Sequence, residues 1–375
     1  MNILLIQRKY MHYRKLLIEY LNETSDFKIT VIDTNTIKNE FKDKYISLKS
    51  NIKKIDLFGK KYEVNYSPEL IRYISENCQK YDIVILEGVT NIINNIFIYK
   101  ILKKKNVPYV WWGAGRRIGA GMTPVRKLVQ PFVKKVMTNA SACIAYSSIA
   151  KQYMMSVGVP EQKIFICQNT LNVSHYDEVI KTINVNRINQ IREKHNLTNE
   201  KIILYVGALQ KRKRVEDLID AVAKLKNINY MLLIVGGGEH RQELEKYCNK
   251  LGLQNVKFLG EIVDGVIEYF ILCDVFVLPS EGGLALNQAM ICSKPVIASS
   301  ADGTERDLIE QGINGYIFEE GNKEQLKYYL QLILEEKNNN LGRRSREIID
   351  QKVNEVTFKK NFIEAINYAV ENTKK

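Results

Sequence analysis

Short runs of aliphatic and β-branched residues recur along the chain, separated by amphipathic stretches of helical length. This alternation is typical of βαβ units, in which helices cover both faces of a mostly parallel sheet. In the first half it predicts strands at 2–7, 28–33, 82–87, 108–112, 142–146 and 164–168. In the second half it predicts strands at 202–206, 230–235, 256–259, 275–278, 295–298 and 316–318. The fold class expected is therefore α/β, with two doubly wound, Rossmann-like domains.

A polar segment with few strand signals, residues 172–200, separates the two halves and is expected to be helix and linker. We place an N-terminal domain at 1–172 and a C-terminal domain at 200–355. A final helix at about 356–372 can pack back on the first domain. Ser67 before Pro68 has the form of an N-cap followed by proline at the first helical position, which predicts a helix running to about residue 80.

The net charge of +13 is concentrated in the first half of the 375-residue chain. Residues 1–175 hold 27 Lys and Arg against 13 Asp and Glu, whereas the remainder holds 28 against 29. Residues 88–160 contain eleven basic residues and no acid. Such a stretch indicates an anionic partner. For the triplet at 103–105 alone, an exposed and solvated face is an equally good interpretation.

Compartment and membrane signals are few. The six cysteines form no C-x-x-C pair, which suits a reducing cytosol. The first residues are apolar before they are basic, the reverse of a secretory signal, and no apolar run approaches the ~20 residues of a membrane-spanning helix. Residues 123–137 place apolar positions among Arg126, Lys127, Lys134 and Lys135. This helix can lie on an anionic membrane, or its apolar face can pack into its own domain. The expected location is the cytoplasm, with peripheral association at the inner face of the plasma membrane as an option.

Open α/β sheets bind ligands beyond the carboxyl ends of their strands, so the candidate chemistry is expected in the loops there. Residues 207–214 join a glycine turn to a basic cluster at a helix start, which suits phosphate. Cations in a first helical turn oppose the helix dipole and therefore need a reason. Residues 235–239 contain three glycines that permit close backbone approach to a ligand.

Residues 279–290 form the third loop and open a helix. Glu281 can accept hydrogen bonds from sugar hydroxyls, and the bare amides of Gly282, Gly283 and Leu284 can meet an anion. A fourth strand-end loop spans 301–307.

These residues carry a resemblance. Residues 207–214, 279–299 and 303–315 resemble, in order and spacing, family 4 retaining glycosyltransferases of the GT-B fold, whose two domains face each other across a cleft. Weaker matches at 12–14, 112–116, 146–147 and 168–171 look like a bacterial branch that builds surface polysaccharides such as capsule, exopolysaccharide or lipopolysaccharide.

The resemblance implies a nucleotide-sugar donor held by the second domain, with the base near 260–262, and a glycan or lipid-linked acceptor held by the first. Lys213 and Glu281 carry the expected catalytic roles. The expected donor-binding residues are Gly207, Arg212, Lys213, Gly236, Gly260, Ile262, Glu281, Gly282, Gly283, Leu284 and Gln288. The expected acceptor-binding residues, most of which follow the first strand, are Arg8, His12, Tyr13, Arg14 and Arg116.

Three positions depart from the family pattern. Gln288 stands in place of a ribose-binding glutamate and lies one residue closer to Glu281 than in the family. Ala208 stands where the family has a phosphate-binding arginine, and Ala114 where related sequences often have a histidine facing the sugar. These departures leave open whether activity is reduced or redirected.

No D-x-D sequence occurs, and Lys and Arg can meet the phosphate charge, so neither a metal nor a cofactor is expected. Three other functions remain open. A nucleotide-sugar epimerase of the same architecture would consume donor without acceptor, and a non-catalytic scaffold would bind no nucleotide. A nucleic-acid-binding protein is suggested by charge alone and lacks the recognised modules of that class.

Overall fold

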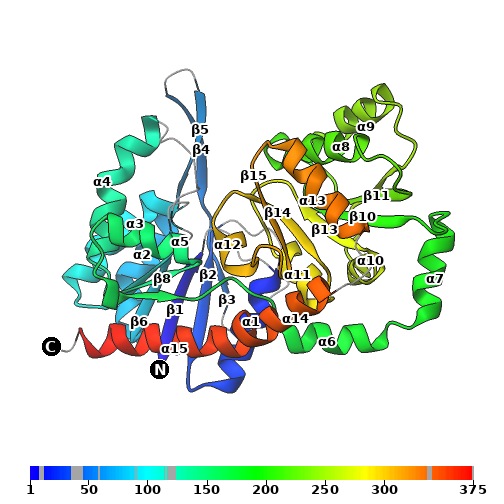
Figure 1. The fold of residues 1–375 in the computed structure, drawn as a ribbon. Coiled ribbons are helices and arrows are strands. Elements are labelled where there is room, and N and C mark those ends of the chain that lie inside the picture. The colour runs from blue at the N-terminus through cyan, green and yellow to red at the C-terminus, as the bar shows by residue number, and fades with distance from the viewer. Residues whose placement is uncertain are drawn as a thin grey trace. The chain divides into compact units, whose positions relative to one another are not determined.

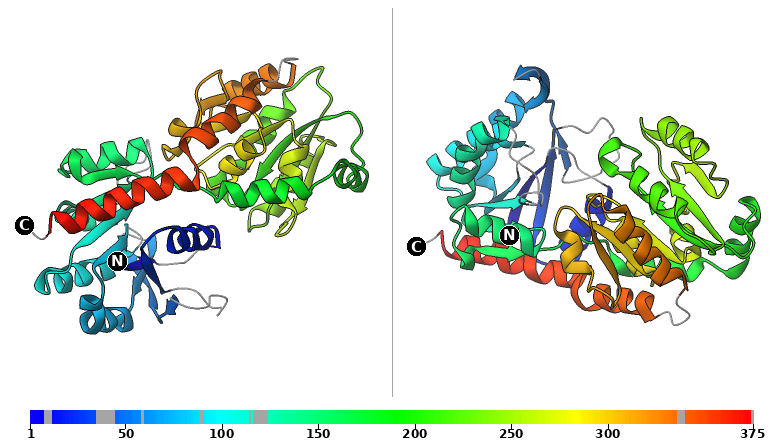
Figure 2. Two further views of the ribbon diagram at one scale, coloured as in Figure 1. Left: turned by 90° about the horizontal axis from the view of Figure 1, so that it is seen from below. Right: turned by 45° about the horizontal axis from the view of Figure 1, so that its top comes forward.

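The computed structural model describes residues 1–7, 12–34, 45–57, 60–88, 91–113, 115, 124–335 and 340–373. The chain forms two compact units (Figure 1). The first comprises Met1–Asn169 with Glu355–Lys375, and the second comprises Thr170–Asn354. Both chain termini therefore belong to the first unit, as Figure 2 shows.

The first unit is built on a seven-stranded sheet in the order β3-β2-β1-β6-β7-β8-β9, and all its neighbouring strands are parallel. The strands are β1 (Asn2–Gln7), β2 (Lys28–Asp33), β3 (Tyr45–Ser47), β6 (Ile83–Glu87), β7 (Tyr109–Gly113), β8 (Ala142–Ala145) and β9 (Ile164–Ile166). The apolar runs of β1, β6, β7 and β8 are buried, as in parallel sheets whose faces are covered by helices.

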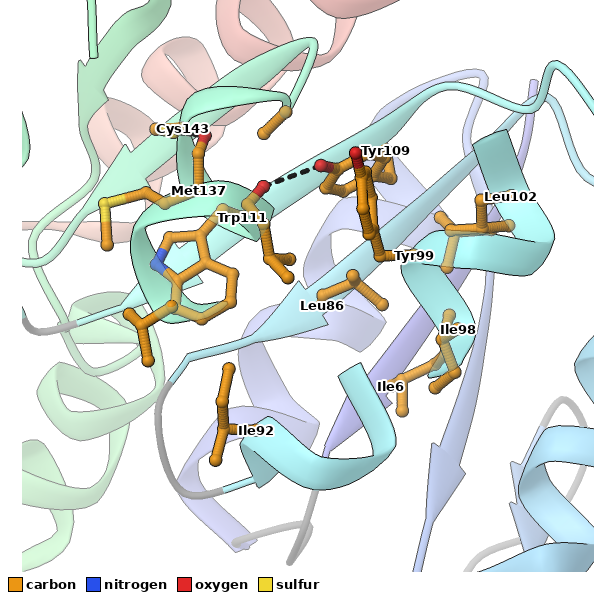
Figure 3. Packing of buried hydrophobic residues seen from close by; sticks show 14 of the residues in the cluster. Ile6, Leu86, Ile92, Ile98, Tyr99, Leu102, Tyr109, Trp111, Met137 and Cys143 are labelled. Carbon is orange, nitrogen blue, oxygen red and sulfur yellow. Dashed lines mark hydrogen bonds between the residues drawn. The ribbon is translucent and has the colours of Figure 1, made fainter. Parts of the chain in front are cut away.

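Helices cover both faces of this sheet. One core contains side chains of α2 (Pro68–Asn77), α3 (Ile92–Lys104), α4 (Pro124–Thr138) and α5 (Ser148–Ser156), and Figure 3 shows part of it. The other core contains side chains of α1 (His12–Thr24) and α15 (Glu355–Glu371). The final helix expected at 356–372 is thus α15, which contributes Phe358 and Phe362 to the core of the first unit. The expected N-cap is present, since Ser67 Oγ accepts from the Leu70 amide at 3.2 Å.

A two-stranded antiparallel hairpin of β4 (Asn51–Leu57) and β5 (Lys60–Tyr66) was not anticipated, and neither was β3. The hairpin sequence holds four lysines and no aliphatic run, so the hydrophobic pattern does not mark it as strand.

The second unit repeats the architecture with six parallel strands in the order β12-β11-β10-β13-β14-β15. They are β10 (Lys201–Val206), β11 (Tyr230–Val235), β12 (Val256–Gly260), β13 (Val275–Leu278), β14 (Val296–Ser300) and β15 (Gly315–Glu319). One core joins the sheet to α8 (Val215–Ala223), α9 (Arg241–Lys250), α13 (Lys323–Glu335) and the start of α14 (Asn340–Lys352). Helices α10 (Val266–Leu272), α11 (Ala285–Ile291) and α12 (Thr304–Leu308) also belong to this unit.

The segment expected to be helix and linker forms α6 (Val173–Thr182) and α7 (Val185–Lys194), and both belong to the second unit. Arg346 of α14 donates to both carboxylate oxygens of Asp177 on α6, at 2.6 and 2.8 Å. This bidentate pair lowers the pKa of Asp177. Arg187 of α7 donates to Glu268 of α10 at 2.8 Å.

All six cysteines are free thiols, five buried and one half-buried. Among the helices in the described ranges, none is both long and apolar enough to span a bilayer.

Candidate functional site

The site is assembled from loops at one edge of the second sheet. Strands β10, β13 and β14 are neighbours in the sheet and run parallel, so their carboxyl ends meet at the same edge. The loops that follow them are residues 207–214, 279–284 and 301–303. Separate sequence segments thereby supply one site, as expected for open α/β sheets.

Two cations of the first loop contact Glu281 of the second. Arg212 Nη1 donates to Glu281 Oε1, and the two side chains form an ion pair. Lys213 Nζ donates to the Glu281 carbonyl oxygen at 2.8 Å. Glu281 is 69 residues from Arg212 in sequence, and its side chain is 26% exposed. The strand ends thus bring a guanidinium, an ammonium and a carboxylate together beside solvent.

Neighbouring side chains hold these loops in place. Ser280 Oγ donates to the Arg212 carbonyl oxygen at 2.6 Å, which ties the second loop to the first. Asp302, at the end of β14, accepts from the Gly282 amide at 3.2 Å and from the Thr304 amide at 3.0 Å. This corrects one expectation, because the Gly282 amide is bonded to a carboxylate and not bare. An incoming anion would have to replace Asp302 there.

The basic cluster directly precedes helix α8, whose first turn is acidic. Lys211–Lys213 form a 3-10 turn, η4, that precedes helix α8. Arg214 is the N-cap residue in a left-handed conformation with φ of 52°, and the first turn of α8 contains Glu216 and Asp217. Arg214 donates to Asp217 at 2.6 Å. The cations therefore precede the α-helix, and the first turn itself carries acids, which the helix dipole favours at that end.

The glycines of the site serve the packing of the loops on one another. Gly236 has φ of +138°, and a Cβ on it would lie 2.0 Å from the Gly207 carbonyl oxygen. Its amide donates to the Gly260 carbonyl oxygen at 2.7 Å. A Cβ on Gly238, where φ is +151°, would lie 2.2 Å from the Leu209 carbonyl oxygen. Close approach of backbone to backbone requires glycine at these two positions.

Gln288 and Ile262 lie on two further segments that follow strands of the second sheet. Gln288, on α11, donates from Nε2 to the hydroxyl of Tyr176 on α6 at 3.0 Å. Burial raises the pKa of that Tyr176 hydroxyl. The amide nitrogen expected to meet a ribose is therefore bonded within the protein. Ile262 is half-buried in the loop after β12, and Gly283 and Leu284 directly precede α11.

Glu305 is an unexpected titratable group beside these loops. It is 4% exposed and accepts from the Ala301 and Gly303 amides, both at 2.9 Å. Burial, together with the nearby charge of Asp302, raises its pKa to about 7. Within the described ranges, no three His, Cys, Asp or Glu side chains are grouped as ligands for a metal ion.

The first-unit residues expected to bind acceptor are only partly described. Arg8, Arg116 and Ala114 lie outside the described residues, and so do the side chains of His12 and Tyr13, whose backbone begins α1.

Arg14 is the one acceptor residue whose side chain is described, and it is 4% exposed. Its Nη2 donates to the Tyr146 hydroxyl at 2.8 Å, and its Cζ lies 4.4 Å from the centre of the Trp112 ring. A cation over an aromatic face is stabilised by the ring quadrupole. The structure thus places a buried guanidinium at the strand ends of the first sheet.

Sequence reasoning missed Ser280, Asp302, Tyr176 and Glu305 as members of the site. Ser280 and Asp302 lie in loops already singled out, and their position directly after a buried strand could have marked them. Tyr176 carried no such signal, because its contact with Gln288 spans 112 residues.

The chain resembles known glycosyltransferases in its sequence and in its fold. Residues 187–372 match the family model described as glycosyl transferases group 1. An uncharacterized glycosyltransferase of Methanocaldococcus jannaschii is 30% identical over 216 residues, which are 56% of this chain and 60% of that protein. The lipopolysaccharide 1,6-galactosyltransferase of Salmonella typhimurium is 27% identical over 291 residues, 74% of this chain and 71% of that protein. The chain thus spans less than two thirds of the first of these relatives.

Among solved structures, Anabaena HepE in complex with UDP aligns with a TM-score of 0.79 and 19% identity, covering 98% of this chain and 100% of that one. The same protein has also been solved with UDP-glucose. Residues 187–372 are therefore similar to group 1 glycosyl transferases, and the chain has the GT-B fold of these solved structures.

Proposed function

We propose that this protein is a glycosyltransferase that moves a sugar from a nucleotide-sugar donor to a glycan or lipid-linked acceptor with retention of anomeric configuration. The observation that carries the proposal is the contact of Arg212 and Lys213 with Glu281 at the carboxyl edge of the second sheet. Cations suit a diphosphate, and a carboxylate beside them suits sugar hydroxyls. The group 1 family match and the UDP-glucose complex of HepE support a nucleotide-sugar, with UDP-sugars as the first donors to test.

In this proposal the donor diphosphate displaces part of the network now formed within the protein. Arg212, whose side chain is 53% exposed, exchanges its bond to Glu281 for a phosphate oxygen, while Lys213 stays beside the leaving group. Glu281, so released, accepts from the sugar. The Gly283 and Leu284 amides complete the phosphate contacts, Gln288 turns to the ribose, and the base lies near Gly260 and Ile262.

The chemistry needs no enzyme nucleophile in this proposal. The bond between the anomeric carbon and the diphosphate oxygen breaks, and the acceptor hydroxyl oxygen bonds to the same carbon on the same face. The hydroxyl proton passes to an oxygen of the departing phosphate, and the nucleoside diphosphate leaves. Preorganised cations beside the diphosphate lower the barrier because negative charge develops there. Neither a metal nor a cofactor takes part, so activity is expected to survive EDTA.

The first unit holds the acceptor in this proposal, with Arg14 beside Arg8, His12, Tyr13 and Arg116. The lipopolysaccharide galactosyltransferase among the relatives supports an acceptor in surface-polysaccharide synthesis. The excess of cations in the first unit suits an acceptor linked to a lipid diphosphate. We also place the protein in the cytoplasm, in peripheral contact with an anionic membrane surface through α4.

The test is a thermal-shift screen with UDP, GDP and ADP sugars, followed by product analysis with a lipid-linked acceptor. A donor that binds only the folded chain raises the midpoint of thermal unfolding, and the rise grows with the logarithm of donor concentration over Kd. Transfer with retained configuration in the presence of EDTA is expected. Failure to bind any nucleotide would favour a non-catalytic scaffold, and donor turnover without acceptor would favour an epimerase.

A further inference from the structure

A groove of about 560 Å³ lies in the first unit, between α3 and α4. Apolar and aromatic side chains of Ile96, Tyr99 and Val136 contribute to its lining. The rest of the lining is supplied by Lys100, Lys103, Lys104, Phe132 and Lys135. None of these residues takes part in the candidate donor site, which belongs to the second unit.

The two helices that form the groove are held to one strand. The Tyr99 ring packs edge-on against Tyr109 of β7, with ring centres 5.9 Å apart. The Tyr109 hydroxyl donates to the Val136 carbonyl oxygen of α4 at 2.6 Å, the dashed line of Figure 3. Helices α3 and α4 are therefore both anchored in the buried core, and this fixes the groove between them.

The charge of the groove has one sign. Lys100, Lys103 and Lys104 are spaced i, i+3 and i+4 on α3, so they share a helix face and repel one another. Lys135 adds a fourth cation from α4. Among the described residues, none of these four lysines forms an ion pair, and residues 88–160 contain no acid. The helix dipoles favour cations in the last turns, but they do not balance four clustered charges.

Large apolar side chains stand exposed on the same two helices. On α4, Val133 and Val136 are buried in the core, whereas Leu128 is 65% exposed and Phe132 48% exposed. Leu128 and Phe132 are one turn apart and so lie on the same side of the helix. Phe97 of α3 is 42% exposed, and Lys100 stands 5.9 Å over its ring. Helix α4 therefore has an inner apolar face and an outer one, and the alternatives of core packing and surface contact both apply to it.

We infer that the groove between α3 and α4 binds the anionic headgroup of a membrane phospholipid, while Leu128, Phe132 and Phe97 enter the bilayer interface. Clustered lysines meet the lipid phosphate, and exposed aromatic and aliphatic side chains gain from burial among acyl chains. A second copy of the chain fits less well, because it would bring the same positive charge. This inference deepens the proposed membrane contact by assigning it a site, and it does not depend on sugar transfer.

The experiment compares two double variants of the full chain that each lose two exposed lysines. Lys100→Ala with Lys135→Ala removes charges from the groove, and Lys127→Ala with Lys134→Ala is the control. At 100° per residue, Lys127 and Lys134 lie roughly 140° and 160° around α4 from Phe132. Partitioning is measured by flotation at low salt, with phosphatidylcholine vesicles that contain or lack phosphatidylglycerol.

The wild-type chain is expected to float only with phosphatidylglycerol. The groove variant should lose about 30-fold in partitioning, and the control less than about threefold. Equal losses would overturn the groove site in favour of general electrostatic attraction, and no flotation of the wild type would overturn the inference altogether. Self-association without vesicles that the groove variant abolishes would assign the face to a second copy.

A second pair of variants tests the apolar contribution. Phe132→Ser should weaken flotation, whereas Met155→Ser on α5, where the methionine is 40% exposed, should not. Transfer to a soluble acceptor should be unchanged in all groove variants. If the wild-type chain floats with the vesicles but transfers no sugar, the result counts against the proposed function alone. The membrane site and the proposed function can therefore fail separately.

Discussion

The two units share one architecture and use charge in opposite ways. The first carries 31 Lys and Arg against 16 Asp and Glu, and the second carries 24 against 26. In the second unit, cations beside the site pair with carboxylates, as Arg212 does with Glu281 and Arg214 with Asp217. In the first, the lysines of α3 and α4 belong to a stretch with no acid at all.

This difference shows that a shared sheet architecture does not determine whether the cations of a unit are paired with acids. Both sheets place loops at their carboxyl edges, and in the second unit the site cation Arg212 is held by an acid of the same unit, Glu281. A paired cation is preorganised for a small, highly charged ligand. An unbalanced positive surface attracts an extended anionic partner over a distance of about a Debye length.

The largest expected effect is on turnover, and it should distinguish Lys213 from its neighbour Lys211. Lys213→Ala should lower turnover about 100- to 1,000-fold, because a preorganised charge beside the leaving diphosphate is lost. Lys211→Ala removes the same charge from an exposed neighbour and should change turnover less than about threefold. Steady-state kinetics with a saturating donor measure both. Equal turnover in the two variants would remove Lys213 from the mechanism.

A backbone change tests how the loops of the second unit are held. Gly236→Ala forces a Cβ to 2.0 Å from the Gly207 carbonyl oxygen at a φ of +138°. The free energy of unfolding should fall by about 2–4 kcal/mol. Gly283→Ala is the control, because nothing lies within 4 Å of its added Cβ. Urea denaturation measures both, and an unchanged midpoint for Gly236→Ala would mean that the loops separate easily.

Glu305 and its neighbour Asp302 predict that the stability of the fold depends on pH. The pKa of Glu305 in the folded chain, about 7, is above its ordinary value of 4.5, because burial disfavours the charged form. Its protonated form stabilises the fold fully below about 4.5, and this contribution is lost as pH rises towards about 7. The loss should be on the order of 1–3 kcal/mol.

Urea denaturation at several pH values between about 4.5 and 7 measures the slope of the free energy of unfolding against pH. Glu305→Gln cannot titrate, so its slope should be smaller by the contribution of this carboxyl. The same slope in both proteins would show that Glu305 is already ionised at the lower pH.

The smallest expected effect concerns the buried cation of the first unit. Tyr146→Phe removes the hydroxyl that accepts from Arg14 Nη2, and should lower the free energy of unfolding by about 1 kcal/mol. If Arg14 also positions the acceptor, the acceptor KM should rise while the donor KM is unchanged. Tyr328→Phe, at a tyrosine that is 57% exposed, is the control for loss of a hydroxyl. No change in stability or KM would show that the Tyr146 hydroxyl does not position Arg14.

The sequence predicted most strands to within about two residues, because apolar runs buried on both faces are the strongest local signal in a parallel sheet. It missed β3, which has only three residues, and the β4–β5 hairpin, whose sequence has four lysines and no aliphatic run. It also predicted which loops carry the candidate chemistry, because those loops follow directly on the strands. Within the loops it could not assign partners, and the Gly282 amide is an example.

What the amino-acid sequence determined by itself is local: the strands, the Ser67 cap, the glycine and cation loops, and the acid-free stretch. What only the tertiary structure decided is pairing at long range: Arg212 with Glu281, Asp302 with the Gly282 amide, Gln288 with Tyr176, and α3 with α4 around a lysine-lined groove. The physical reason is that propensity and periodicity act within a few residues. Hydrogen bonds and ion pairs between loops depend on which strands become neighbours, and that is settled by the packing of the whole sheet.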